Sequence, residues 1–327
     1  MKQQGTAAAA ALGAKEKEGP RLGSFGRHFR RDWQLHLLIL LPLAYILIFR
    51  YWPMYGVQIA FRNYRAHDGI TGSQWVGLKW FTKFLTSYNF KQVFSNTLLL
   101  SLYDILVEFP LPVIVALLLN TVQNERFKKL TQNITYVPHF ISIVVIVSIM
   151  NQIFSPVNGL YGTFYRLFGG NGYPFDFRGL AGSFRHMYVW SGVWQNLGWD
   201  TIIYLAALGS VSSEQHEAAM IDGATRWQRV LHVDLPALLP TACICLILRC
   251  GSVMSVGFEK VYLMQSTLNL TQSEVISTYV YKVGMGASSD FSYGTAIGLF
   301  NSVINCIVLV IVNFVSTKVS SDEVGLF

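Results

Sequence analysis

Long apolar stretches dominate this chain and restrict it to a fold that spans a membrane. A bilayer core requires about 20 mostly apolar residues in each helix. Six segments approach this requirement: Trp33–Phe49, Asn96–Leu119, Ile134–Phe154, Met187–Leu208, Thr241–Gly257 and Tyr293–Val315. Hydrophobic residues form 52% of the chain and charged residues only 13%, which fits a polytopic membrane protein better than a soluble domain. The sequence therefore predicts an all-α protein with six transmembrane helices, the second bent by its prolines.

Positive residues that flank the first stretch indicate the orientation of the chain. Three arginines come just before it: Arg27, Arg30 and Arg31. Because basic residues accumulate on the cytoplasmic side, we expect both termini in the cytoplasm of a multi-pass protein of the cytoplasmic (inner) membrane. Residues 1–32 lack a secretory pattern and are predicted to be a basic, largely disordered tail. Residues 33–318 should form the transmembrane domain, and residues 319–327 a short cytoplasmic tail.

A short polar segment separates the fourth and fifth apolar stretches. Ser212, followed three residues later by Gln215, is a capping-box pattern that predicts the start of a helix. Gly223 supplies the permissive backbone that ends this helix. A second short helix is expected over Ala224–His232, until Pro236 interrupts its pattern. The predicted local structure is a helix, a bend and a second helix.

The same segment resembles the EAA loop of ABC importer permeases, the cytoplasmic element that docks on the ATPase. That family pattern is Glu-Ala-Ala, three residues, Gly, nine residues, an aliphatic residue, one residue and Leu-Pro. Glu217–Pro236 meets every spacing, with Val233 as the aliphatic residue. The resemblance implies the type I ABC importer permease fold and a cytoplasmic coupling loop over residues 212–236. It assigns contact with the ATPase to the following residues: Glu214, Glu217, Ala218, Ala219, Asp222, Gly223, Leu235 and Pro236.

The resemblance extends over most of the chain from about residue 33 to residue 318. Trp75–Leu78 and Asn96–Leu98 are similar to the maltose-type sugar permeases. Further stretches are similar to the subgroup that imports oligo- and polysaccharides, including alginate-type importers: Pro138–Ser142, Ser255–Val261, Val275–Tyr281 and Gly298–Asn305. This family implies four kinds of partner: a second permease subunit, two ATPase subunits that hold ATP and Mg²⁺, an extracytoplasmic solute-binding protein and the oligosaccharide itself. Translocation would follow alternating access, driven through the coupling loop.

Motifs for chemistry on this chain are absent from the sequence. There is no GxxxxGK[ST] phosphate loop, HExxH zinc motif, GxSxG nucleophile elbow or CxxC pair. We therefore expect a transport subunit without catalytic residues, cofactor or metal of its own. The four cysteines fall inside predicted spans and are interpreted as packing residues. The net charge of +7 fits membrane orientation and contact with lipid, and is no evidence for nucleic acid.

Four ionisable residues inside the predicted spans are candidates for the substrate pathway, because charges are costly there. They are Asp104, Glu108, Asp200 and Arg249. Asp104 and Glu108 lie four residues apart on one helix face, so their repulsion requires an offsetting charge. Arg249 either pairs with one of these acids as a structural ion pair or faces the pathway and meets a substrate carboxylate or hydroxyl. Both alternatives are open at the level of sequence.

Charge outside the membrane bears on the substrate. Three segments are predicted to lie outside the membrane: about Arg50–Ser95, Ser155–His186 and Phe258–Ser292. They carry 11 Lys and Arg residues against five acids, which favours the approach of an acidic, alginate-like oligosaccharide. The same charges could contact an acidic binding protein or lipid headgroups. Two other functions are less well supported. A self-sufficient secondary transporter should show internal repeats, and an intramembrane enzyme should show a nucleophile or a metal set.

Overall fold

The structure, a computed structural model, describes residues 33–286 and 289–319. The predicted cytoplasmic tail over residues 1–32 and most of the tail over residues 319–327 lie outside these ranges. The chain divides into two compact units, Met1–Val57 and Gln58–Phe327. The described part of the first unit holds helix α2 (Trp33–Ile46) and a π-helical turn, η1 (Leu47–Tyr51), and the boundary between the units falls within the 3-10 segment η2 (Trp52–Phe61).

The second unit begins with the region that precedes its first long helix. Strands β1 (Arg62–Arg65) and β2 (Ser73–Trp75) pair antiparallel, with Arg62 opposite Trp75. Two short helices accompany them, α3 (Gly69–Gly72) and α4 (Lys79–Leu85). Trp80 and Phe84 of α4 are buried in a hydrophobic core together with residues of α16 and α17.

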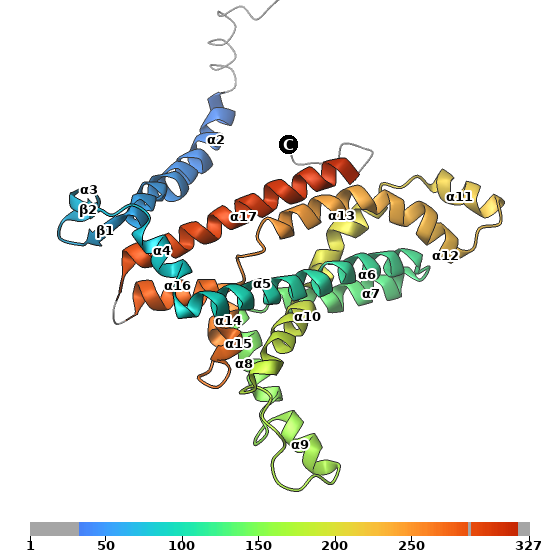
Figure 1. Cartoon of the computed structure of the whole chain (residues 1–327). Helices are drawn as coiled ribbons and strands as arrows, with labels where there is room; N and C mark the ends of the chain where they lie inside the picture. Colours follow the sequence, from blue (N-terminus) through green and yellow to red (C-terminus); the bar gives the residue numbers. More distant parts are fainter. Residues whose placement is uncertain (1–32, 287–288, 320–327) are drawn as a thin grey trace, which may run out of the picture. The chain divides into compact units, whose positions relative to one another are not determined.

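The second predicted span is two consecutive helices, α5 (Tyr88–Glu108) and α6 (Pro110–Thr121), which run end to end (Figure 1). The regular helix is interrupted at Phe109, directly before the first of the two prolines. A proline at the start of a helix is tolerated because that N–H needs no intrahelical partner. The two helices together form a candidate span of 34 residues.

The third predicted span, Ile134–Phe154, is broken in the structure and begins within an earlier helix. The structure has α7 (Glu125–Tyr136), a 3-10 turn η3 (Val137–Phe140) and α8 (Ile143–Ile153), with a bend of 101° at the break. Pro138 cannot continue the hydrogen bonding of α7, and Ser142 starts the new helix because its Oγ accepts from Val145 N.

The remaining long helices build the body of the second unit. Helix α10 (Ala181–Leu208) has 28 residues and packs on α5, α6 and α13. Helix α13 (Leu235–Cys250) lies beside α17 (Phe291–Val319), as Figure 1 shows. The other elements are α9 (Leu160–Leu167), α11 (Ser213–Ile221), α12 (Arg226–Arg229), η4 (Val230–Asp234), α14 (Phe258–Met264), α15 (Leu270–Ser273) and α16 (Ile276–Met285).

The predicted end of the fifth span also differs from the structure. Helix α13 stops at Cys250 and not at Gly257, because Gly251 begins a series of tight turns. Asn305 of α17 stabilises this unwound segment, since its Oδ1 accepts a hydrogen bond from Met254 N at 2.8 Å. Polar side chains of neighbouring helices commonly satisfy the backbone where a membrane helix ends early.

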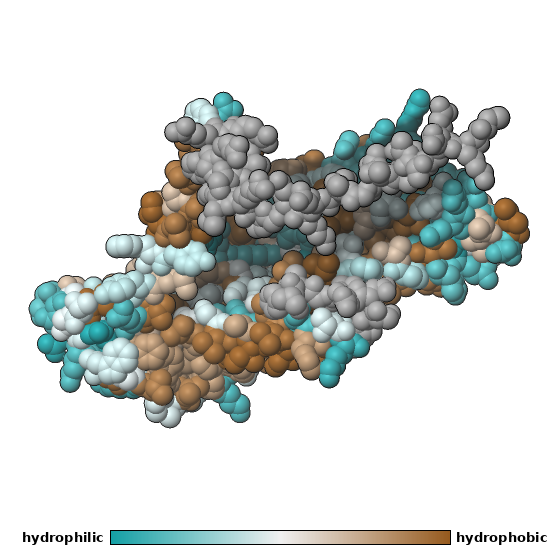
Figure 2. Space-filling model, turned by 90° about the horizontal axis from the view of Figure 1, so that it is seen from above, coloured by the Kyte–Doolittle hydropathy of each residue, from teal (hydrophilic) through white to brown (hydrophobic). Residues whose placement is uncertain are grey.

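Four described helices are long and apolar enough to cross a membrane, and the bent α7–α8 pair raises the number to five. Helix α10 has sufficient length, about 42 Å at the usual rise per residue, but is less apolar. The described structure is thus compatible with six spans. Large apolar side chains remain exposed on several helices, and Figure 2 shows broad hydrophobic areas on the face it presents, as expected of a surface that meets lipid or other subunits.

Candidate functional site

Residues 212–236, predicted to couple the chain to the ATPase and called the coupling segment below, begin with a helix that starts and ends where the sequence predicts. Ser212 caps α11, because its Oγ accepts a hydrogen bond from Glu214 N at 3.2 Å. The bond reaches Glu214 and not Gln215, the residue that the capping-box pattern singled out. Gly223 ends the helix with φ of +78°, in the left-handed region that favours glycine. The predicted bend at Gly223 is confirmed.

The second helix is longer than predicted. Thr225 and Gln228 form a reciprocal capping box at the start of α12, with Thr225 N donating to Gln228 Oε1 at 2.7 Å. From there α12, η4 and α13 run as one helix of 25 residues to Cys250, so the predicted interruption at Pro236 is wrong. The π-helical turn η4 directly before α13 widens the hydrogen-bonded ring, and Pro236 sits in the first turn of α13, where its missing N–H is tolerated.

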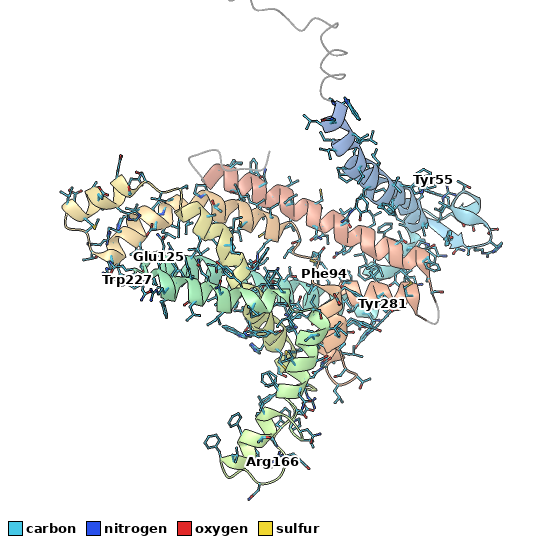
Figure 3. The ribbon with its side chains drawn as sticks, turned by 180° about the vertical axis from the view of Figure 1, so that it is seen from behind. Tyr55, Phe94, Glu125, Arg166, Trp227 and Tyr281 are labelled. Atoms are coloured by element: carbon cyan, nitrogen blue, oxygen red, sulfur yellow. The ribbon has the colours of Figure 1, made fainter. Side chains whose placement is uncertain are left out.

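The residues expected to contact the ATPase form an accessible surface. Glu214, Glu217, Ala218, Asp222 and Gly223 are exposed, and so is Pro236, whereas Ala219 and Leu235 are half-buried. Exposed apolar side chains lie among them, with Ile221 86% and Trp227 66% accessible. Figure 3 shows Trp227 at the same end of the second unit as Glu125, the first residue of α7. Exposed apolar residues within a polar segment indicate a contact surface for another protein.

A buried carboxylate lies beneath this surface. Asp234 is only 3% exposed, and its Oδ1 accepts a hydrogen bond from Asn120 Nδ2 at 3.2 Å. It borders a cavity of about 300 Å³ that is also lined by Arg226 and Arg229. Asp234 was not among the residues predicted from the sequence, where its only signal is a carboxylate between the apolar Val233 and Leu235 of the motif.

The intramembrane charges are brought together by three helices. Arg249 of α13 donates from Nη2 to Asp200 Oδ2 of α10 at 2.6 Å, and from Nη1 to Glu108 Oε2 of α5 at 3.5 Å. Asp104 lies one turn before Glu108 and lines a cavity with it. The arginine thus has the ion-pair partners that one of the two alternatives requires, while a role of these residues in the substrate pathway stays a prediction.

Lys260 belongs to the same cluster and was missed by the sequence analysis. Lys260 is only 7% exposed, and its Nζ donates a hydrogen bond to the backbone oxygen of Tyr188 at 2.8 Å. Gly192 leaves space for these charged side chains, because a Cβ there would overlap Glu108 Oε1 and lie 3.2 Å from Lys260 Nζ. The sequence placed Lys260 in a predicted outer segment, so only the folded chain reveals its burial. The cluster contains three acids and two bases.

Two cavities border this cluster. One, of about 230 Å³, is lined by Asp104, Glu108 and Arg249 together with the hydroxyl-bearing residues Ser101, Tyr188, Ser252 and Ser255. The other, of about 300 Å³, is lined by Glu108, Asp200 and Arg249 together with Trp199 and Tyr204. Carboxylate and hydroxyl groups around a cavity can exchange hydrogen bonds with a polyol. No group of three or more His, Cys, Asp or Glu side chains suited to a metal occurs within residues 33–286 and 289–319.

Comparison with known proteins identifies relatives over nearly the whole chain. Protein LplB of Bacillus subtilis (strain 168) is 42% identical over 298 residues, which cover 91% of this chain and 92% of LplB. The polygalacturonan/rhamnogalacturonan transport system permease protein YteP of the same organism is 38% identical and covers 89% of each chain. Among solved structures, a chain of a bacterial ABC transporter that imports the acidic polysaccharide alginate aligns with a TM-score of 0.82 and 33% identity, over 91% of this chain and 100% of that chain.

A second structure of the alginate transporter, in complex with a periplasmic protein that holds an alginate pentasaccharide, aligns with a TM-score of 0.81 over 90% of this chain. These alignments establish the type I ABC permease fold. Residues 108–321 match the family described as "Binding-protein-dependent transport system inner membrane component". Because this match spans more than half of the sequence, the chain belongs to that family and is a transport component rather than an enzyme.

Proposed function

We propose that this chain is a permease subunit of an ATP-driven importer for oligo- or polysaccharides, and that its substrates are acidic. The observation that carries the sugar-import part of the proposal is a polar cavity, lined by Asp104, Glu108, Arg249 and serine hydroxyls, within the helical body of the second unit. The names of the relatives support an acidic glycan, because polygalacturonan and alginate are polymers of uronic acids.

The balance of acids and bases in the charge cluster indicates which groups of the sugar it could bind. Three acids face two bases, and Arg249 already bonds to Asp200 and Glu108. The cluster is therefore suited to sugar hydroxyls and poorly suited to a free substrate carboxylate. Attraction of an acidic glycan would come from the outer segments, where the expected topology, without the buried Lys260, places 10 Lys and Arg residues against five acids.

Coupling to ATP would occur through residues 212–236. The exposed motif residues would contact one of two ATPase subunits, which hold ATP and Mg²⁺. Closure of the ATPases would displace α11 and α12, and the continuous helix from Arg226 to Cys250 would carry this movement to Arg249. The result is alternating access of a pathway shared with a second permease subunit, loaded by an extracytoplasmic solute-binding protein. Residues 33–318 would form the permease domain, with both termini in the cytoplasm.

Reconstitution tests this function. The complete transporter, assembled in proteoliposomes with its binding protein, should hydrolyse ATP faster with oligogalacturonates or alginate oligosaccharides than with neutral malto-oligosaccharides of equal length. Equal stimulation by neutral and acidic glycans would overturn the acidic substrate. Uptake by this chain alone, without ATPase subunits, would overturn the importer and favour a secondary transporter.

A further inference from the structure

Two residues are shared by the linings of the two cavities of the charge cluster. Among the described residues, only Glu108 and Arg249 line both the cavity of about 230 Å³ and the cavity of about 300 Å³. Their side chains are 10% and 29% exposed, and they meet at 3.5 Å. The cavity of about 230 Å³ is the distal cavity and the cavity of about 300 Å³ is the proximal cavity, named by their positions relative to residues 212–236.

The two cavities lie in series along the helices. In α5 and α6 the distal cavity is lined by residues 100–108 and the proximal cavity by residues 108–112. In α10 the distal cavity is lined by Tyr188 and the proximal cavity by residues 199–204, which are closer to the coupling segment. Helix α13 runs in the opposite direction and keeps the same order, because Cys245 lines the proximal cavity and Ser252, just after the end of the helix, lines the distal one. The proximal cavity is thus on the side of residues 212–236.

The two hydrogen bonds that Arg249 donates to acidic side chains differ in length. Arg249 is held by Asp200 at 2.6 Å, whereas its contact with Glu108 is 3.5 Å, near the limit of a hydrogen bond. Glu108 also lies near Lys260, since both groups border Gly192 and interact electrostatically. If the long contact breaks, Arg249 keeps its ion pair with Asp200, and Glu108 remains near the positive charge of Lys260 without a direct ion pair to it. This separation is therefore less costly than breaking the short bond between Arg249 and Asp200.

We propose that the contact between Glu108 and Arg249 is a gate that closes the passage between the distal and proximal cavities. Arg249 lies near the end of the helix that begins in the coupling segment, so displacement of α12 along this helix would draw the arginine away from α5. The gate rests on the proposed function in one respect: the displacement is attributed to ATPase subunits. The companion permease would supply the remaining wall of the passage.

The test measures access to one natural cysteine that lines the proximal cavity, Cys245. In the complete transporter, Cys243, Cys250 and Cys306 are changed to serine, and a membrane-impermeant maleimide is added on the side opposite to the coupling loop, without nucleotide. Glu108→Gln should raise the labelling rate of Cys245 about tenfold or more, the shift expected when a charge-assisted hydrogen bond is lost. Glu108→Asp, which keeps the charge but shortens the side chain, should give a smaller increase.

Controls separate the gate from general damage. Glu274→Gln removes an acid from the ion pair with Lys282, which lies outside both cavities, and should leave the labelling rate of Cys245 unchanged. A cysteine introduced in the distal cavity by Ser252→Cys should be labelled at the same rate with and without Glu108→Gln. Unchanged labelling of Cys245 in assembled Glu108→Gln and Glu108→Asp transporters would overturn the gate. Because labelling requires no sugar, a transporter that shows the gated access but ignores acidic glycans would refute the substrate and leave the gate standing.

Discussion

The carboxylate of Asp234 lies 3.3 Å from Nε2 of His216, which connects the π-helical turn before α13 to α11. His216 stands directly before Glu217, the first residue of the EAA pattern, so the contact reaches the centre of the coupling segment. Asn120, near the end of α6, donates a hydrogen bond from Nδ2 to the same carboxylate. This buried group therefore joins three elements that must move together if the segment transmits force.

The first prediction concerns this connection. Asp234→Ala should loosen α11 and reduce the substrate-stimulated rate of ATP hydrolysis more than the basal rate, because it removes the partner of both His216 and Asn120. Leaving buried polar groups unpaired costs about 1–3 kcal/mol. Asp234→Asn retains an oxygen acceptor and should preserve most of the stimulation. Equal stimulation in the alanine variant and the wild type would show that the connection plays no part in coupling.

The second prediction concerns the bend between α11 and α12. Gly223→Ala should destabilise the segment by about 1 kcal/mol, since φ of +78° is strained for a residue with a Cβ. Gly223→Pro should abolish stimulated hydrolysis, because proline cannot adopt this φ and removes the N–H that bonds to Met220 O. Gly209, which ends α10 with φ of −65°, provides the control: Gly209→Ala should couple normally. Normal coupling in Gly223→Pro would exclude a role for the bend.

The sequence predicted those features that depend on local pattern. Apolar length located the helices of the second, fourth and sixth spans, and the capping serine and Gly223 located α11. The bend of 101° within Ile134–Phe154 was missed, although Pro138 and Ser142 mark it, because an apolar run hides the break when only length is considered.

Features that depend on tertiary contacts could not be predicted from the local sequence pattern. Lys260 is separated by 72 residues from the carbonyl of Tyr188 that accepts its hydrogen bond, and by more than that from Glu108. Nothing local indicates that such a lysine is buried, since long basic side chains are usually exposed. The same holds for the contact that stabilises the unwound segment after α13, since it comes from Asn305 of another helix.

The third prediction distinguishes the two roles considered for Arg249. Arg249→Gln should reduce assembly of the transporter, because it removes the ion-pair partner that Asp200 holds at 2.6 Å and that Glu108 contacts at 3.5 Å. Loss of one member of a buried pair costs about 3–5 kcal/mol, and partial exposure reduces this to about 2 kcal/mol or more. The yield of intact complex on size-exclusion chromatography is the measurement. An intact complex that responds less only to acidic glycans would instead indicate direct contact between Arg249 and the substrate.

The fourth prediction concerns pH in the segment between α9 and α10. A side-chain hydrogen bond from Arg178, with Nη2 donating to Oδ2 at 2.7 Å, lowers the pKa of Asp176 below its usual value. The folded state then gains stability that is present above the unfolded pKa and lost as pH falls through the folded pKa, below about pH 4. The hydrogen-exchange protection factors of residues 170–180, corrected for the intrinsic pH dependence of amide exchange, should fall in that range. Asp176→Asn should show lower protection factors at neutral pH and lose the pH dependence; protection factors that still depend on pH in the variant would contradict the assignment.

The last prediction uses the narrow space beside the charge cluster. Gly192→Ala places a Cβ in the position of Glu108 Oε1 and within 3.2 Å of Lys260 Nζ, so the carboxylate must leave its site or α10 must move away from α5. Because Glu108 and Lys260 are buried and charged, displacing either is more costly than the small volume of a methyl group suggests. The variant should lower the thermal stability of the assembled transporter and raise the labelling of Cys245. Gly182→Ala, in the first turn of the same helix, meets no atom within 4 Å and should leave both measurements unchanged. If the two alanine variants behave alike, Glu108 does not occupy the space that Gly192 provides.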